Sequence, residues 1–200
     1  QSLLLPKPHA AESQLPSSRV DYFYFINKKS QGLVDIHGNT IIPLTANQAI
    51  LPPSDNMLRL AKVEKKQIAK AYYDLDAEVM VRISSSEKGK FGAFSHNLAP
   101  VSLDDELYFI DKKGNKVIGG LSKAFLSNEG YRVVQKGSAF GAIDSTGAVV
   151  IPIEYTNSLT SVNNGRLGVQ KNASWFYVDM KGQIVSDKYD RIGNFHRGYA

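Results

Sequence analysis

Five aspartates at a nearly constant spacing are the residues whose type and repetition could support chemistry. They are Asp35, Asp74, Asp111, Asp144 and Asp179, which are 39, 37, 33 and 35 residues apart, and all except Asp74 open an Asp-x-x-Gly motif. Repeated carboxylates could bind calcium or act as acids and bases. However, the calcium-loop spacing D-x-[DN]-x-[DN]-G is absent. Asp followed three residues later by Gly is typical of a hairpin turn, in which Asp accepts a backbone N–H bond and Gly takes a positive φ. We therefore interpret these carboxylates as turn residues.

Other chemistry-bearing residues are scattered. The four histidines, His9, His37, His96 and His196, form no H-x-x-x-H or H-E-x-x-H pair, and the chain has no cysteine. The sequence contains no G-x-S-x-G, Walker or G-x-G-x-x-G motif. The acidic run 104–106 falls at a predicted hairpin tip, where carboxylates are solvated. We predict no catalytic residue, no metal site and no organic cofactor, and hence a protein that is not an enzyme.

The aspartates sit between short apolar segments that recur in every unit. Examples are Gly141-Ala-Ile143 before the turn and Val149-Val-Ile-Pro152 after it, and a third segment such as Gly130-Tyr-Arg-Val-Val134 comes about ten residues earlier. The sequence thus predicts an all-β fold, a tandem array of three-stranded antiparallel meanders of about 33–39 residues each. The predicted repeats span residues 20–53, 54–92, 93–124, 125–157 and 158–194, and a sixth begins at 195–200.

The repeated unit resembles the WG (KWG) repeat, with about five degenerate copies. The segments that carry the resemblance are Phe140-Gly-Ala-Ile-Asp144-Ser-Thr-Gly147 with its Val-Ile-Pro152 continuation, and Trp175-Phe-Tyr-Val-Asp179-Met-Lys-Gly182 through Tyr189-Asp190. No Trp-Gly pair survives, since Trp175 is followed by Phe176. The resemblance implies an extracytoplasmic or interaction-type repeat module, mostly bacterial, with no catalytic residues to transfer.

Composition narrows the functional classes. The chain has 24 basic and 19 acidic side chains, a formal net charge of +5, without a basic domain that would indicate nucleic acid. No apolar run is long enough to span a bilayer. Residues 1–19, which contain three prolines, are interpreted as a flexible tether. Because the chain opens with Gln1, we expect that a signal peptide has been removed and that the protein is periplasmic, surface-exposed or secreted.

The second repeat is the least regular. Residues 55–73 contain good helix formers, whereas the repeat register places 64–67 at a hairpin tip between two strands. The lysines at 62, 65, 66 and 70, near Tyr72 and Tyr73, could contact an anion, although a solvated tip is the simpler interpretation.

The central strand of each unit has apolar side chains on both of its faces. In successive units, these side chains form two columns along the array. Stacking should bury one column, with Val34, Ile110, Ile143 and Val178 inside, and leave the other against a second layer or as an aromatic strip. If the chain binds a ligand, we expect binding to depend on exposed aromatic residues, with Trp175, Tyr177, Tyr108 and Tyr131 as the candidates. Such binding would make the chain a binding module for a protein, peptide or glycan at the bacterial cell envelope. The alternatives are a structural surface spacer, favoured if the columns are fully buried, and a hydrolase-associated domain.

Overall fold

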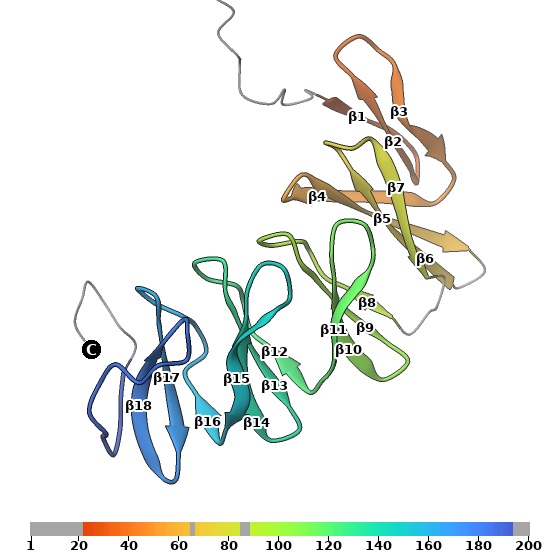
Figure 1. Cartoon of the computed structure of the whole chain (residues 1–200). Helices are drawn as coiled ribbons and strands as arrows, with labels where there is room; N and C mark the ends of the chain where they lie inside the picture. Colours follow the sequence, from red (N-terminus) through yellow and green to blue (C-terminus); the bar gives the residue numbers. More distant parts are fainter. Residues whose placement is uncertain (1–21, 65–66, 85–88, 194–200) are drawn as a thin grey trace, which may run out of the picture.

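The computed structural model describes residues 22–64, 67–84 and 89–193, and within these ranges the chain forms β-strands and turns without a helix. The strands form five antiparallel sheets in which every strand pairs with the next one along the chain. Figure 1 shows the sheets following one another in an arc from the N-terminal to the C-terminal part. The all-β tandem array is confirmed, and the helical alternative for 55–73 is wrong, because β5 and β6 cover this segment.

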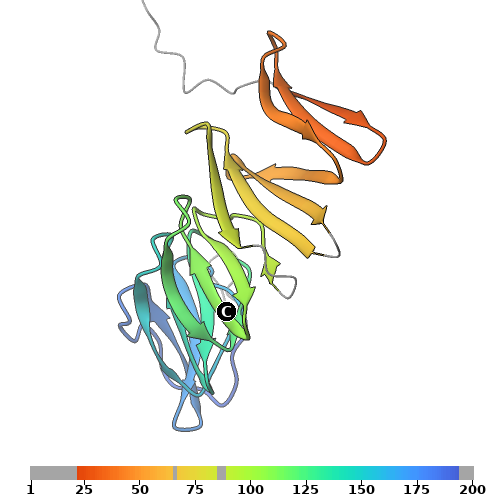
Figure 2. The same ribbon diagram turned by 90° about the vertical axis from the view of Figure 1, so that its right-hand side faces the viewer.

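The first three sheets are formed by β1 (Tyr22–Asn27), β2 (Ser30–Asp35) and β3 (Thr40–Thr45); by β4 (Gln48–Ser54), β5 (Met57–Glu64), β6 (Gln67–Asp74) and β7 (Val79–Ser84); and by β8 (Lys90–Phe91), β9 (Ala99–Leu103), β10 (Glu106–Ile110) and β11 (Lys116–Leu121). The last two are formed by β12 (Lys123–Ala124), β13 (Arg132–Lys136), β14 (Ala139–Ile143) and β15 (Val149–Tyr155), and by β16 (Asn157–Ser158), β17 (Arg166–Lys171) and β18 (Ser174–Asp179). In the view of Figure 2 the last three sheets lie largely behind one another, whereas the first two diverge from them.

Each sheet after the first has an additional leading strand before the predicted meander, and in the fifth sheet the predicted third strand, Ile184-Val185, is reduced to an isolated bridge between Val178 and Ile184. The leading strands are β4, β8, β12 and β16, and three of them are only two residues long. The long strand β4 crosses the predicted boundary between residues 53 and 54, because it pairs with β5 in the second sheet. The tether at 1–19, the lysines at 65 and 66, the side chains at 62 and 70, and the sixth repeat at 195–200 lie outside the described residues.

The Asp-x-x-Gly motifs form the predicted turns. In the fourth unit, Asp144 Oδ1 accepts hydrogen bonds from the backbone N–H groups of Thr146 and Ala148 at 2.8 and 3.1 Å. Gly147 has φ +88°, and its N–H donates to the Asp144 carbonyl at 3.1 Å. The turn at Asp74 differs, since the residue at positive φ is Glu78, one position later. The interpretation of these carboxylates as turn residues is therefore confirmed.

A second turn in each later unit joins the leading strand to the meander. It is a two-residue turn in which both central residues have positive φ, as in type I′ hairpins. The pairs are Asp55–Asn56, His96–Asn97, Glu129–Gly130 and Asn164–Gly165. These turns also join neighbouring units: Asp55 accepts the N–H of Asn97 at 2.8 Å, and Glu129 accepts those of Asn164 and Gly165 at 2.7 and 2.9 Å.

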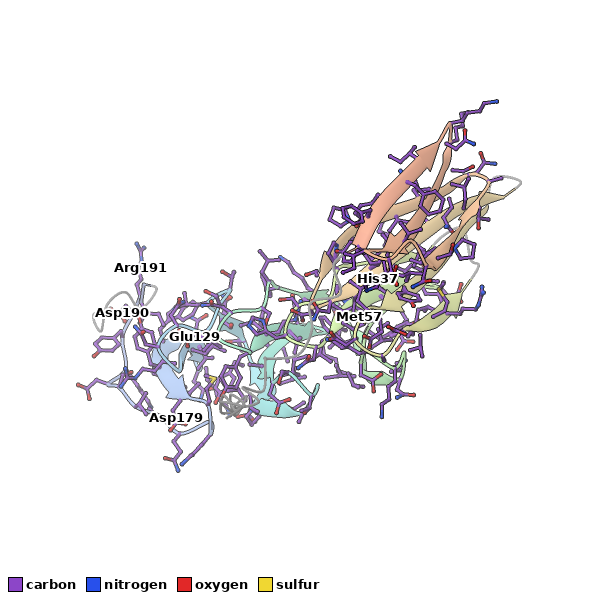
Figure 3. The ribbon with its side chains drawn as sticks, turned by 90° about the horizontal axis from the view of Figure 1, so that it is seen from above. His37, Met57, Glu129, Asp179, Asp190 and Arg191 are labelled. Atoms are coloured by element: carbon purple, nitrogen blue, oxygen red, sulfur yellow. The ribbon has the colours of Figure 1, made fainter. Side chains whose placement is uncertain are left out.

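The core lies between adjacent sheets, and the inner sheets are buried on both faces. In β10, Ile110 packs toward the second sheet with Met57 and Tyr72, whereas Phe109 packs toward the fourth sheet with Ile143. Met57 is labelled in Figure 3. Burial of Ile110, Ile143 and Val178 is confirmed. The expectation for Val34 is wrong, since this side chain is half-buried and Leu33 faces the core between the first two sheets.

Candidate binding groove

The four aromatic residues predicted as binding candidates lie at separate places. Tyr108 is on β10, Tyr131 precedes β13, and Trp175 and Tyr177 are on β18. Tyr177 is only 4% exposed, and its hydroxyl donates to the carbonyl of Gly193, so its expected exposure is corrected. The other three are half-buried, and Tyr131 packs against the core of the last two sheets. The structure thus replaces a continuous aromatic strip with separate local environments.

Tyr108 lines a cavity of about 350 Å³ between the second and third sheets. We call this cavity the inter-sheet groove. Its walls come from β7, from the tip and strands of the third sheet and from the turn after β10: Arg82, Ile83, Leu103, Asp104, Glu106, Tyr108, Ile110, Gly114 and Lys116.

Side chains that alternate along β10 place one wall of the groove. Glu106, Tyr108 and Ile110 share the face directed at the second sheet, because side chains two residues apart in a strand lie on one face. Ile110 is 1% exposed and anchors this face in the core. The next turn closes tightly on β7, since a Cβ at Gly114 would lie 2.8 Å from Val81 Cγ1. The groove is thus bounded by packed backbone.

An ion pair occupies the rim of the groove. Lys116 Nζ donates to Glu106 Oε1 at 2.6 Å, and the N–H of Gly120 donates to the same oxygen at 3.0 Å. The hydrogen bond from Lys116, followed by that from Gly120, lowers the pKa of Glu106, so this carboxylate is ionised at neutral pH. A Cβ at Gly119 would meet Lys116 Cε at 2.3 Å and Glu106 Oε1 at 2.7 Å. In this geometry the ion pair lies where a side chain at 119 would otherwise stand, so a larger residue there would require the Lys116 and Glu106 side chains to move.

Tyr108 completes the polar rim. Lys116 Nζ lies 5.0 Å from the centre of its ring, within the range of a cation–π contact. Burial, as the main cause, raises the pKa of Tyr108, so the phenol remains protonated at neutral pH. Within the described part of the chain, the Tyr108 hydroxyl and the Asp104 carboxylate form no hydrogen bond with other residues. Both groups belong to the lining of the groove.

Comparison of the units with one another distinguishes the third from the rest. At the positions equivalent to Glu106, Tyr108 and Lys116, counted from the Asp of each turn, the other units have small or apolar residues: Ser30, Ala69, Ala139 and Ser174; Gly32, Ala71, Gly141 and Phe176; and Thr40, Val79, Val149 and Ile184. Arg82 and Gly119 occupy the position at which the first and fourth units have Pro43 and Pro152. These departures from the repeat pattern are brought together in one groove. They were present in the sequence, but a search for known motifs does not detect them.

A second cavity of about 450 Å³ lies at the C-terminal end of the described array, lined by Tyr177, Tyr189, Arg191, Ile192 and Gly193. Arg191 and Asp190 are labelled in Figure 3, far from His37 of the first sheet. Among the described residues, no group of three or more His, Asp or Glu side chains could hold a metal ion. No helix among them is long and apolar enough to span a membrane.

The repeated turn and strand pattern agrees with a known family. The model of the WG containing repeat matches residues 140–175 and 175–200. Residues 140–200 are thus similar to the WG repeat. No curated protein matches the sequence significantly. The WG match and the five tandem sheets make the chain a β-repeat module of binding or structural type.

Several solved structures are similar to this chain at low identity. A eukaryotic initiation factor has 11% identity and a TM-score of 0.34, with 85% of this chain and 63% of that chain covered. Hsv2p of Kluyveromyces lactis has 16% identity and a TM-score of 0.38, with coverages of 84% and 62%. TolB of Acinetobacter baumannii has 15% identity and a TM-score of 0.32, with coverages of 78% and 47%. The chain thus spans less than two thirds of the length of these structures, and their likeness adds nothing to the functional argument.

Proposed function

We propose that the chain is a non-catalytic binding module of the bacterial cell envelope and that the inter-sheet groove is its contact site. The observation that supports this function is the convergence of Glu106, Tyr108 and Lys116 on one cavity, although the other units have small or apolar residues at these positions. A few polar groups that converge on a cavity with apolar lining are characteristic of ligand sites. The partner is a protein, peptide or glycan, and the placement outside the cytoplasm is part of the proposal.

A structural spacer is the competing function, because the inner sheets are buried on both faces. A spacer needs the stacked apolar columns but not the polar groove. The two functions therefore predict different results for a variant in which the third unit is returned to the residue types of the other units.

Retention from a solubilised envelope fraction by the immobilised chain tests this proposal. The test variant is Glu106→Ala/Lys116→Val, which restores residues found in the fourth unit. The matched control is Glu154→Ala/Lys171→Ala, which removes another exposed ion pair, 2.8 Å long, away from the groove. Loss of an exposed pair costs at most about 1 kcal/mol, so both variants should fold.

A component retained by the unaltered chain and by the control, but not by the groove variant, would support the binding function. Equal retention by all three chains, or no retained component, would support the spacer. Fractionation of the producing bacterium with an antibody against the chain checks the location, and a cytoplasmic signal would contradict the envelope placement.

A further inference from the structure

The composition of the inter-sheet groove specifies a class of ligand. We infer that the groove binds a neutral saccharide unit. The polar side chains of the third sheet would hold its hydroxyl groups, and the apolar side chains of the lining would contact its C–H face. This inference rests on the proposed binding function and adds the chemistry of the ligand.

The charges around the groove balance. Arg82 and Lys116 are basic, and Asp104 and Glu106 are acidic, so the formal charge of the lining is zero. Lys116 is also neutralised directly by Glu106 at 2.6 Å. A strongly acidic or basic ligand would meet a like charge of the rim and would gain little from the net field. A ligand without formal charge fits this balance.

The rim offers alternating donors and acceptors within a small cavity. The Tyr108 hydroxyl can both donate and accept, Lys116 has three N–H donors of which Glu106 uses one, and Asp104 offers the oxygens of its carboxyl group as acceptors. A sugar hydroxyl also donates and accepts at once, so neighbouring hydroxyls can pair with an ammonium group and a carboxylate at the same time. An apolar ligand would leave these groups without partners when they lose water.

Apolar side chains also line the groove. Ile83, Leu103 and Ile110 belong to its lining, and this combination of apolar and polar groups matches the C–H face and hydroxyl edge of a sugar ring. The volume of about 350 Å³ is near the lower end of ligand cavities, which span about 300–1,000 Å³. The groove is therefore suited to a ring-sized group of a longer chain.

The backbone of the third sheet favours recognition by side chains. β10 pairs with β9 on one side and with β11 on the other, so its N–H and C=O groups are not open to an added strand. The N–H of Gly120 on β11 already donates to Glu106. A peptide that binds as an extra strand needs an open row of such groups. β10, which carries Glu106, Tyr108 and Ile110, does not present that row, whereas β7 and β11 are edge strands of their sheets. Because the recognition groups of β10 are side chains, the saccharide is the better fit to this strand, and a peptide probe tests strand addition at β7 or β11.

Titration of the isotope-labelled chain with defined oligosaccharides, followed by amide NMR, tests the inference. The neutral probes are the tetramers of β-1,4-glucose, α-1,4-glucose, β-1,4-xylose and β-1,4-N-acetylglucosamine, at millimolar concentration. Tetragalacturonic acid is the acidic probe, and a tryptic digest of the envelope fraction is the peptide probe. We expect at least one neutral tetramer to shift the signals of Ile83, Leu103 and Tyr108.

The variants identify the groups that bind. Tyr108→Phe keeps the packed ring and removes one hydroxyl, so it should weaken the affinity about tenfold, the effect of one lost hydrogen bond. Glu106→Ala/Lys116→Val should weaken it at least as much, and Glu154→Ala/Lys171→Ala should leave it unchanged. Moderate salt should have little effect, because the probe is uncharged.

Binding of only the acidic tetramer, binding of only peptides, or no shift with any neutral probe would overturn the saccharide inference. The proposed binding function would stand after each of these results if an envelope component was retained by the unaltered chain but not by the groove variant. It would fail separately if retention did not depend on the groove. The two experiments therefore distinguish a wrong ligand class from a wrong function.

Discussion

Replacement of the turn glycine Gly147 by Ala should destabilise the fourth unit through two separate causes. The first is the backbone, because Gly147 has φ +88° and a non-glycine residue at left-handed dihedrals costs about 1–2 kcal/mol. The second is packing: a Cβ at 147 would lie 2.5 Å from Cγ2 and 2.8 Å from Cβ of Val117, which belongs to the neighbouring sheet. Overpacking of this kind costs about 1–3 kcal/mol. The expected loss is therefore about 2–5 kcal/mol.

Two other turn glycines supply matched controls. Gly182 has φ +76°, and a Cβ there would meet Pro152 Cδ at an ordinary 3.5 Å; a Cβ at Gly38, with φ +84°, meets nothing within 4 Å. Gly182→Ala and Gly38→Ala should thus lose only the backbone contribution of about 1–2 kcal/mol. Combining Gly147→Ala with Val117→Ala removes the nearest clashing atom, so the double variant should lose less than the sum of the single losses, by about 0.5–1 kcal/mol.

Native-state hydrogen exchange of buried strand amides measures these losses unit by unit, because a repeat array can open locally. The loss in each variant is measured as the opening free energy at an amide in the central strand of the same unit. This amide is Ala142 for Gly147→Ala, Val178 for Gly182→Ala and Leu33 for Gly38→Ala. Equal losses for the three glycines, or strict additivity of Gly147→Ala and Val117→Ala, would refute the idea that the turn glycine is a packing position between units.

Three further predictions concern packing, acid stability and the joints between units. Ile143→Ala should cost about 2–5 kcal/mol in the opening free energy of the fourth sheet, because the side chain is 0% exposed; a cost below about 0.5 kcal/mol would contradict the described packing. Mainly the Asn39 side chain lowers the pKa of Asp35. The contribution of the Asp35 carboxylate to stability is therefore present above the unfolded-state pKa of about 3.9 and is lost as pH falls through the lower pKa of the folded state. Between pH 5 and pH 2, the melting temperature should fall more steeply for the unaltered chain than for Asp35→Asn. Parallel curves would contradict this prediction. Glu129→Ala removes two inter-unit acceptors, so exchange at the N–H groups of Asn164 and Gly165 should accelerate while the Val134 amide does not change; unchanged exchange at both amides would show that the joint does not depend on this carboxylate.

The sequence predicted the parts of the fold that depend on local physical chemistry. An Asp that accepts two backbone N–H groups and a Gly at positive φ fix the turn wherever they occur, so the period and the strands around it could be inferred from the residues. The type I′ turns were missed because their central residues differ from unit to unit, from Asp55–Asn56 to His96–Asn97. The leading strands β8, β12 and β16 were missed because two residues carry no alternation pattern.

Burial of both columns depends on stacking, which local sequence does not determine. The aromatic strip was predicted on the assumption that one face of each sheet meets solvent, whereas Phe109 and Ile110 are both covered by neighbouring sheets. Tyr108 was selected for its ring, and its partners Glu106 and Lys116 were not. They become visible as a group only when the units are compared position by position, because a charged pair then stands out at two positions that are small or apolar in every other unit.

The joint between the second and third sheets explains how such a groove stays open. Several polar contacts connect the second and third units. Among them, the Tyr72 hydroxyl donates to the Gly92 carbonyl at 2.8 Å, Arg59 Nη1 donates to the Phe91 carbonyl at 3.2 Å, Ser54 Oγ donates to the Phe94 carbonyl at 2.5 Å, and Asp55 accepts the N–H of Asn97 at 2.8 Å. Tyr72 and Phe94 are both about fully buried, and their rings meet edge to face at 4.9 Å. Because these contacts hold the walls at a fixed separation, the groove does not have to be created by the ligand. A preformed cavity reduces the ordering that binding must offset, so even a ring-sized ligand with few contacts can bind measurably there.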